Sequence, residues 1–530
     1  MSESPGRQSF YGPADATVDY ARDLGDPGQF PYTRGRRAPS AAAGSGWIHR
    51  ELSGEGDPRR SNGQLHRLLA DGALGVDVIG DNPTQSALDP DHPMCEAAVG
   101  TTGVSICRAR DFVELLEGIP LDRITLSHSL PAAFAIAGQH LAATELGFDP
   151  TVLRGSAIQG PLYTEDCSYA MFLPFDIRMR LSLDSIMFSL KHMPRFHPYL
   201  EDTYFISDGG LDAVEEMALG FVQLREITRQ LLGRGVPIDA FAPRIAMLVN
   251  CRMDIFEEIA KIRATRRLYA RMMRDEFGAR DERSCSVNIA VHTSGLTLTA
   301  AQPANNIARG AIQGLAMALA GVQGLEISTF DEPFRTPSAE AHQVGLRTQQ
   351  IIHLEAGAGR VADPLGGSWY VESLTDELET RIDELVRQIE ARGDAAELVD
   401  SGFFRSIFHA GMDRHSRQVH SGELAVVGVN CHTIPPAQDR LLRDEAEERF
   451  PADHAHVERI RAWRTTRDKD VLAQRLEEVS AATAGGDDLM GPIRSALAGE
   501  ASIGEITGAL RMGVGHPADP FARSSAPGRS

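Results

Sequence analysis

The sequence predicts an α/β fold: a (β/α)8 TIM barrel with an N-terminal arm and a helical C-terminal extension. From about residue 60, short apolar runs alternate with longer amphipathic stretches. Such alternation, repeated seven or eight times over roughly 300 residues, is typical of parallel strands with covering helices. The expected strands span residues 74–80, 123–129, 153–160, 203–207, 244–250, 286–292 and 321–328.

Composition along the chain predicts its domains. Residues 1–45 are rich in Gly, Pro, Ala and Ser and are expected to form an extended arm. The barrel is expected over residues 46–375, followed by a helical region over 376–515. Residues 516–530 contain Pro, Ser and Gly and are expected to be a disordered tail.

The expected strands indicate an unusual barrel interior. Interior-facing residues of such barrels are commonly Val, Ile and Leu, but LSHS, GSAIQG and AVHTSG place small or polar residues at strand ends. A partly open lumen could admit a long, thin ligand. The arm segment GQFPYTRG (28–35) is then either a loop strapped across the surface or an arm that reaches into a ligand site.

Charge and cysteine usage exclude several classes of function. The formal net charge is −20 and no basic stripe is present, which argues against a nucleic-acid partner. No run of 18 apolar residues or signal peptide is present, so we expect a cytoplasmic protein without a membrane segment. Six scattered cysteines without a CxxC spacing indicate reduced thiols and no metal site.

Eight short motifs follow one another along the chain. They are PGQFPYTRG, GDNPTQSALDPDHP, DAFAPR, HTSGLTLT, NNIARG, LRTQQII, DPLGGSWYVESLT and VVGVN. From about residue 20 to about residue 515, the chain resembles the large, catalytic subunit of the coenzyme-B12-dependent methylmalonyl-CoA mutase family. The resemblance implies a barrel threaded by coenzyme A, with 46–375 as the acyl-thioester-binding domain. It also implies a radical 1,2-rearrangement of the carbon skeleton that uses adenosylcobalamin.

The resemblance also implies a partner subunit. The family's cobalamin domain carries Asp-x-His-x-x-Gly, but here Asp413-Arg414-His415 continues with Ser-Arg-Gln. The chain therefore resembles the split, isobutyryl-CoA mutase-like type, in which a small cobalamin-binding subunit carries most of the cofactor. A hetero-oligomer is expected.

The family's reacting residues map onto this chain with changes. Gln159 and Tyr204 match family residues, whereas Phe205 replaces the histidine that hydrogen-bonds the thioester carbonyl. His292 stands where the family has Gln, and is either a replacement hydrogen-bond donor or a structural histidine. The expected catalytic residues are Tyr204, His292 and Gln159.

Further residues are expected to bind ligands. The expected substrate-binding residues are Tyr32, Thr33, Arg34, Arg50, Leu52, Asp77, Ile79, Phe205, Asn288 and Ser294. The expected cofactor-binding residues are Glu332, Asp208 and Gly80, with no metal ligand. Arg34 either contacts substrate or only ties the arm to the barrel. Asn288 stands where the family has a CoA-contacting Arg, and Arg36 and Arg37 either meet phosphates or are solvated loop charges.

The substrate is expected to be a monocarboxylic acyl thioester. The arginine that binds the methylmalonyl carboxylate would fall near Ser168 or Tyr169, where no Arg stands, and an unpaired carboxylate in an enclosed site is costly. Leu52 replaces an aromatic residue and leaves room for an isobutyryl-like or bulkier group. Ile79 offers no hydroxyl partner, and Asp77 is a weaker polar candidate on the same strand face.

Three classes of function remain open from sequence. The first is a cobalamin-dependent mutase large subunit acting on a thioester of either CoA or a phosphopantetheinyl carrier protein. The second is a non-catalytic structural subunit of a mutase complex, favoured by the changes at Phe205 and Asn288. The third, an acid–base barrel enzyme, lacks carboxylates paired at a convincing spacing.

Overall fold

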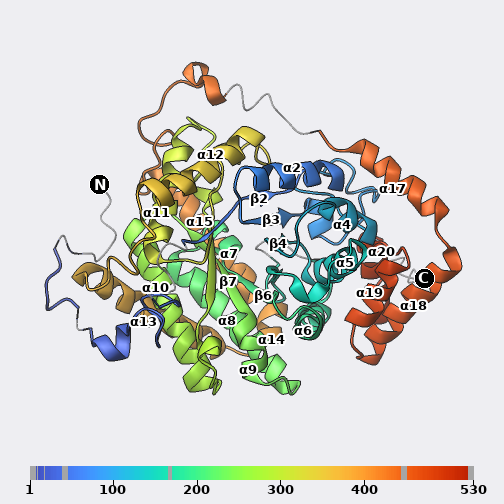
Figure 1. Ribbon diagram of the computed structural model, residues 1–530, viewed down its shortest axis with the longest axis horizontal. Coiled ribbons are helices and arrows are strands. Elements are labelled where there is room, and N and C mark those ends of the chain that lie inside the picture. Colours follow the sequence, from blue (N-terminus) through green and yellow to red (C-terminus); the bar gives the residue numbers. More distant parts are fainter. Residues whose placement is uncertain are drawn as a thin grey trace, which may run out of the picture. The chain divides into compact units, whose positions relative to one another are not determined.

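The computed structural model describes residues 8, 10–16, 18–38, 46–164, 170–442 and 451–522. Nine parallel strands form a nearly closed barrel flanked by helices, in the order β1-β9-β8-β7-β6-β5-β4-β3-β2, which confirms the predicted fold class (Figure 1). The strands are β1 Ile48–Arg50, β2 Leu52–Ser53, β3 Gly75–Ile79, β4 Thr125–Ser129, β5 Gly155–Gln159, β6 His197–Asp202, β7 Ile245–Cys251, β8 Asn288–Thr293 and β9 Gly324–Glu326.

The ninth strand arises because the first barrel strand is split. Only Glu51 separates β1 from β2, yet the two strands lie at opposite ends of the strand order. The segment 48–53 therefore fills one barrel position with two short pieces. The sequence WIHRELS has no apolar run, which is why periodicity did not predict a strand there.

One predicted strand is wrong. Residues 203–207 were expected to be extended, but Tyr204–Asp208 form the short helix α7, and the strand β6 comes immediately before it. The segment HPYLED was not recognised as a strand because it carries a proline and two acidic residues. Tyr204 and Ile206 of TYFIS are buried by one helical turn instead of by a sheet, and Phe205 is half-buried.

Helices occupy most of the remaining described residues. In the first two thirds they are α2 Pro58–Ala70, α3 Asn82–Gln85, α4 Ala109–Leu116, α5 Ala132–Glu145, α6 Phe175–His192, α7 Tyr204–Asp208, α8 Ala213–Gly233, α9 Ile238–Phe241, α10 Ile255–Arg271, α11 Asn305–Ala320 and α12 Ala339–Gln350. Further along they are α13 Trp369–Glu390, α14 Ala395–Asp400, α15 Phe403–Ser421, α17 His454–Thr466, α18 Lys469–Gly485, α19 Met490–Ala498 and α20 Ile503–Gly513. Among the described residues, no helix is both long and apolar enough to cross a membrane.

The chain divides into two compact units. The first comprises residues 1–52, 67–76 and 199–449, and the second comprises 53–66, 77–198 and 450–530. Each unit thus combines part of the predicted barrel region with part of the predicted helical region.

In the first unit, β6, β7, β8, β9 and β1 pair in parallel register. Helix α10 packs beside α13, and α13 beside α8, on the outer side of these strands (Figure 1). On β8, Ile289, Val291 and Thr293 are fully buried, whereas Asn288 and Ala290 are half-buried. We therefore assign Asn288, Ala290 and His292, which alternate with the buried set, to the inner face of the strand.

The described part of the arm does not run extended throughout. It forms a short helix at Tyr20–Leu24 and then a compact turn, in which the Gly28 amide donates to the Gly35 carbonyl over 2.9 Å. Gly28 and Gly35 have φ values of 86° and 115°, which a glycine adopts without a steric cost.

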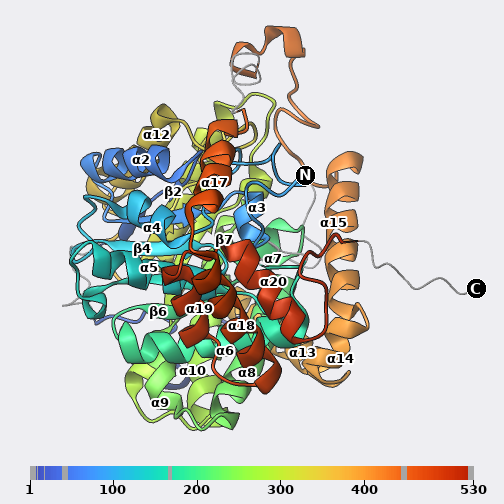
Figure 2. The same cartoon turned by 90° about the vertical axis from the view of Figure 1, so that its right-hand side faces the viewer.

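In the second unit, the DPDHP motif supports the C-terminal helices. Asp89 accepts from the Gly504 amide over 2.8 Å and from the Ser502 hydroxyl over 2.5 Å at the start of α20. Arg464 of α17 pairs with both Asp89 and Asp91. Helices α18, α19 and α20 lie together (Figure 2), and at the end of the described chain Phe521 packs on Phe172.

Candidate functional site

Tyr204 and His292 form an aromatic stack in the first unit. Tyr204 begins α7 directly after β6, and His292 lies near the carboxyl end of β8. Their rings are 4.6 Å apart and inclined by only 11°, while the Phe205 ring packs edge-on against Tyr204 at 5.0 Å. The structure therefore brings together both mapped aromatic positions and the substituted histidine.

A polar cluster lies next to this stack. Asp208, at the end of α7, accepts hydrogen bonds from the Ser294 hydroxyl over 2.8 Å and from Asn250 Nδ2 over 2.6 Å. Asn250 Nδ2 also donates to the Tyr204 carbonyl over 3.1 Å. Burial raises the pKa of Asp208, and burial together with the Asp208 and Glu332 charges raises that of the Tyr204 hydroxyl. Tyr204 therefore stays protonated at neutral pH.

Glu332 and His292 are both held in uncharged forms. Burial raises the Glu332 pKa to about 8, and burial lowers the His292 pKa to about 4. His292 Nε2 lies 3.9 Å from Glu332 Oε1 and 3.0 Å from the Ser328 hydroxyl. At neutral pH this end of the site is therefore a low-charge environment.

A buried ion cluster packs against the start of α7 and the end of β7. Lys261 of α10 lies 2.7 Å from Glu216 and 2.6 Å from Glu258, and it donates to the Asn250 carbonyl over 2.9 Å. Glu216 in turn accepts from the Thr203 hydroxyl over 3.0 Å and from the Asn250 amide over 3.1 Å. The cluster thus fixes Thr203, which directly precedes Tyr204, and Asn250, which donates to Asp208 and to the Tyr204 carbonyl.

The YTRG side chains make contacts within the first unit. The Tyr32 hydroxyl donates to the Glu282 carbonyl over 3.1 Å, and the Thr33 hydroxyl donates to the Asp23 carbonyl over 2.5 Å. Arg34 Nε donates to Asp363 over 3.0 Å, and its Nη1 donates to the Tyr20 hydroxyl over 3.0 Å. These are the contacts of an anchor, and they support the interpretation in which Arg34 ties the arm down.

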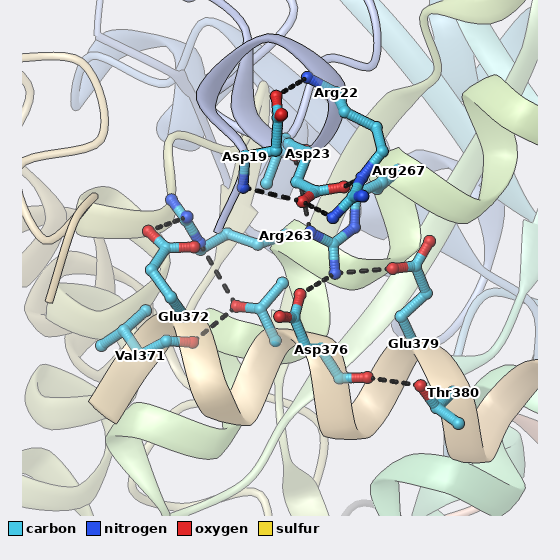
Figure 3. Close-up of polar contacts among 12 residues, drawn as sticks. Asp19, Arg22, Asp23, Arg263, Arg267, Val371, Glu372, Asp376, Glu379 and Thr380 are labelled. Atoms are coloured by element: carbon cyan, nitrogen blue, oxygen red, sulfur yellow. Dashed lines mark hydrogen bonds and ion pairs between the residues drawn. The ribbon is translucent and has the colours of Figure 1, made fainter. Parts of the chain in front are cut away.

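A second ion network anchors the same arm (Figure 3). Arg267 of α10 pairs with Asp376 and Glu379 of α13, each over 2.6 Å. Asp23 of the arm pairs with Arg271 over 3.1 Å. Arg263 pairs with Glu372 over 2.5 Å and also with Asp363, the partner of Arg34. The arm is therefore held by carboxylates and guanidinium groups that satisfy one another.

A cavity of about 430 Å³ lies beside the arm. Arg34, Arg36, Arg37 and Arg360 contribute to its lining, together with Trp47 and other residues. Arg36 donates to the Asn288 side-chain oxygen and, over 3.2 Å, to the Ser286 hydroxyl. Within the described chain no carboxylate pairs with Arg36, and burial and the Arg37 charge lower its pKa. Asn288 is thus joined to a cation that the arm supplies.

Two other predicted residues lie on the split first strand. Arg50 is in register with Glu326 of β9, and Arg50 Nη1 lies 3.7 Å from Glu326 Oε1. Glu326 is in turn in register with His292. Leu52 is half-buried, and its carbonyl lies 2.8 Å from His342 Nε2.

The remaining predicted residues belong to the second unit. Gln159 donates to the Ser185 hydroxyl over 3.0 Å and to the Pro198 carbonyl over 2.8 Å, at the edge of a small cavity of about 40 Å³. Asp77 accepts from the Ser129 hydroxyl at 3.3 Å.

Ile79 and Gly80 are positioned by their backbones. The Ile79 carbonyl accepts from the Val104 amide over 2.9 Å. A Cβ on Gly80 would lie 2.6 Å from the Leu130 side chain and 2.9 Å from the Thr84 side chain, so a larger residue would displace these neighbours. The positions near Ser168 and Tyr169 lie outside the described residues. Across the described part of the chain, no group of three His, Cys, Asp or Glu side chains could hold a metal ion.

Sequence reasoning missed three residues of the site. Asn250 and Ser328 end the apolar runs RIAMLVN and GLEIS, so the rule that polar residues gather at the carboxyl ends of parallel strands could have found them. Lys261 could not be found in this way. It sits in an ordinary amphipathic pattern, and the carboxylate of Glu216 that compensates its charge comes from a different helix.

The fold and site define an α/β barrel protein with an anchored N-terminal arm, a cationic cavity beside that arm and a low-charge aromatic site. The model of the methylmalonyl-CoA mutase family matches residues 3–516, and the chain belongs to this family, as predicted. It is 33% identical over 477 residues to the 2-hydroxyisobutanoyl-CoA mutase large subunit of Aquincola tertiaricarbonis, covering 89% of this chain and 84% of the relative. It is 34% identical to the methylmalonyl-CoA mutase of Rhizobium meliloti, covering 92% of this chain and 68% of the relative.

Proposed function

We propose that this protein is the large subunit of an adenosylcobalamin-dependent acyl-CoA mutase. The proposed reaction is a radical 1,2-rearrangement of the carbon skeleton of a monocarboxylic acyl thioester, isobutyryl-like or bulkier. The observation that carries the proposal is the family match over residues 3–516. The low-charge environment of Tyr204, His292 and Glu332 supports it, because such a site excludes ionic side reactions of a radical.

Coenzyme A is the proposed acyl carrier. The cavity beside the arm carries four arginines, of which Arg34 is already paired with Asp363. Arg36 is oriented by Asn288 and Ser286 and has its charge available for a phosphate. Tyr32 and Thr33 are proposed to act by fixing the turn that carries Arg36. A phosphopantetheinyl carrier protein remains the alternative, since it presents a phosphate on a similar chain.

The adenosyl group is proposed to meet the Glu332–Asp208 end of the site. The groups there fit a ligand with hydroxyl donors, because the two carboxyl groups and Asn250 Oδ1 are acceptors. Asn250 Oδ1 is buried, and no described residue lies within hydrogen-bond distance of it. When bound, adenosylcobalamin supplies the radical that starts the rearrangement. This chain's residues would orient the thioester and exclude water.

Cobalamin itself is proposed to be carried by a separate small subunit. The sequence has no Asp-x-His-x-x-Gly, and one relative is named as a large subunit. Across the described residues no cluster could ligate a metal. The proposed assembly is therefore a hetero-oligomer in the cytoplasm.

The test is reconstitution. The purified chain is mixed with a small cobalamin-binding subunit of the family and adenosylcobalamin, and cobalamin binding is followed by absorbance. We expect tight binding only when both proteins are present. Tight 1:1 binding by this chain alone contradicts the split assembly.

One observation favours a second candidate, a non-catalytic subunit of a mutase complex. Phe205 packs edge-on against Tyr204 and carries no hydrogen-bond donor in its side chain. If no thioester is converted by the reconstituted complex and Phe205→His creates activity, this second function replaces the first.

A further inference from the structure

The hydrogen bonds around Ser328 determine which nitrogen of His292 carries the proton. Ser328 Oγ lies 2.5 Å from the Thr293 carbonyl oxygen. A carbonyl oxygen can only accept, and this is the shorter of the two hydrogen-bond contacts of the Ser328 hydroxyl, so we assign its single proton to this contact. Ser328 Oγ then has only lone pairs to offer to any other neighbour.

His292 Nε2 must therefore be the donor in its contact with Ser328 Oγ, over 3.0 Å. Because burial keeps the ring neutral, its other nitrogen, Nδ1, has a lone pair and no proton. Nδ1 makes no hydrogen bond with a described residue. The ring thus presents an unused acceptor.

The ring lies on the face of β8 that we assign to the barrel interior. His292 shares the inner face of β8 with the half-buried Asn288 and Ala290. Ala290 is in register with Gly324 of β9, so the neighbouring positions on this face carry only small side chains. Tyr204 covers one face of the imidazole, so a ligand group meets its edge.

We propose that His292 accepts, through Nδ1, a hydrogen bond from an O–H or N–H donor of the bound thioester close to its acyl group. The inference rests on the proposed function, namely that an acyl thioester binds at this site. It replaces the expectation that His292 donates to the thioester carbonyl, because that role requires a proton on Nδ1. The donor is either a hydroxyl on the acyl group or an amide N–H of the pantetheine chain.

The two sources of the donor are separated by binding measurements on the full chain. Calorimetry compares isobutyryl-CoA with its 2-hydroxy derivative for the native protein and for His292→Phe, which keeps a ring against Tyr204 but has no nitrogen. If the acyl hydroxyl is the donor, the native protein binds the hydroxy derivative about 3- to 10-fold more tightly, and His292→Phe removes this preference. If the pantetheine amide is the donor, His292→Phe weakens both thioesters by about that factor. Unchanged affinity of both ligands in His292→Phe overturns the proposal.

A ligand-free measurement keeps the proposal separate from the proposed function. Nitrogen NMR of the histidine-labelled chain identifies His292 as the signal lost in His292→Phe. We expect an unprotonated Nδ1 and a protonated Nε2, and we expect Ser328→Ala to disturb this signal. The buried His128, whose Nε2 bonds Gln139 over 2.9 Å in the second unit, is the control and should not change. A protonated Nδ1 in the native protein overturns the proposal, whereas failure of every thioester to bind contradicts the proposed function alone.

Discussion

At the amino end of β8, Asn288 lies against the Arg36 guanidinium, whereas near its carboxyl end His292 lies against the Tyr204 ring and the Ser328 hydroxyl. The two residues are separated by about 13 Å of extended chain. One end therefore offers positive charge and the other offers neutral hydrogen-bonding groups. One strand can therefore contact both the charged part and the uncharged reacting part of a ligand such as an acyl-CoA.

The two ends are also held by different kinds of ion network. The arm is anchored by Arg263 and Arg267, whose partners are spread over the arm and α13 (Figure 3). The aromatic end is supported by Lys261, which pairs with the carboxylates of Glu216 and Glu258 and donates to the Asn250 carbonyl. Loss of a single cation should therefore affect the aromatic end most.

The largest expected effect is that of Lys261→Met. The substitution leaves Glu216 and Glu258 buried without their cation, which costs about 3–5 kcal/mol of unfolding free energy. Urea unfolding followed by circular dichroism measures this loss. Lys469→Met, at an exposed position of α18, is the matched control and should change stability by less than about 0.5 kcal/mol. Equal stability of the two variants would show that the ion cluster does not support the site.

The next effect concerns Glu332 and pH. Its pKa is about 8 in the folded protein and close to 4.5 in the unfolded chain, so the folded state binds the extra proton between these values. Native stability should therefore fall by about 1.4 kcal/mol per pH unit as pH rises through this window. Glu332→Gln cannot ionise and should lack this contribution, as measured by the difference between the two proteins at each pH. If the difference in unfolding free energy between the native protein and Glu332→Gln stayed constant from pH 5 to pH 8, Glu332 would not be neutral in the folded protein.

A smaller effect is expected at the cationic end. Arg36→Gln should weaken binding of an acyl-CoA about 10- to 100-fold, because a charge-assisted contact to a phosphate is lost. Calorimetry with CoA itself measures this without turnover. Arg123→Gln, at a position whose side chain is 82% exposed, is the control and should bind as the native protein does. If Arg36→Gln bound CoA as tightly as the native protein does, Arg36 would not contact the CoA phosphate.

The smallest effect is expected for Arg34→Gln. Asp363 keeps its bond to Arg263, so the variant should lose only about 1 kcal/mol of stability and less than about 3-fold in CoA affinity. The same calorimetric and unfolding measurements apply. A loss of CoA affinity as large as that of Arg36→Gln would instead support a direct substrate contact by Arg34.

Much of the fold followed from local patterns, but the closure of the barrel did not. The predicted barrel is confirmed because six of its strands carry buried apolar runs between amphipathic helices. The segment 48–53 and β6 escaped prediction because each mixes a few apolar residues with ionisable ones. Both are buried by pairing with strands remote in sequence. At the site, resemblance supplied Tyr204, His292 and Glu332. The tautomer of His292 depends on the Ser328–Thr293 contact, which only the three-dimensional arrangement reveals.

Product analysis of the reconstituted complex tests whether this chain rearranges a monocarboxylic acyl-CoA. The chain, a small cobalamin-binding subunit and adenosylcobalamin are incubated with isobutyryl-CoA, its 2-hydroxy derivative, a bulkier branched acyl-CoA and methylmalonyl-CoA, and the isomers are separated by mass spectrometry. We expect conversion of at least one monocarboxylic thioester to its straight-chain isomer and little succinyl-CoA. Efficient formation of succinyl-CoA, with no conversion of any monocarboxylic thioester, would contradict it.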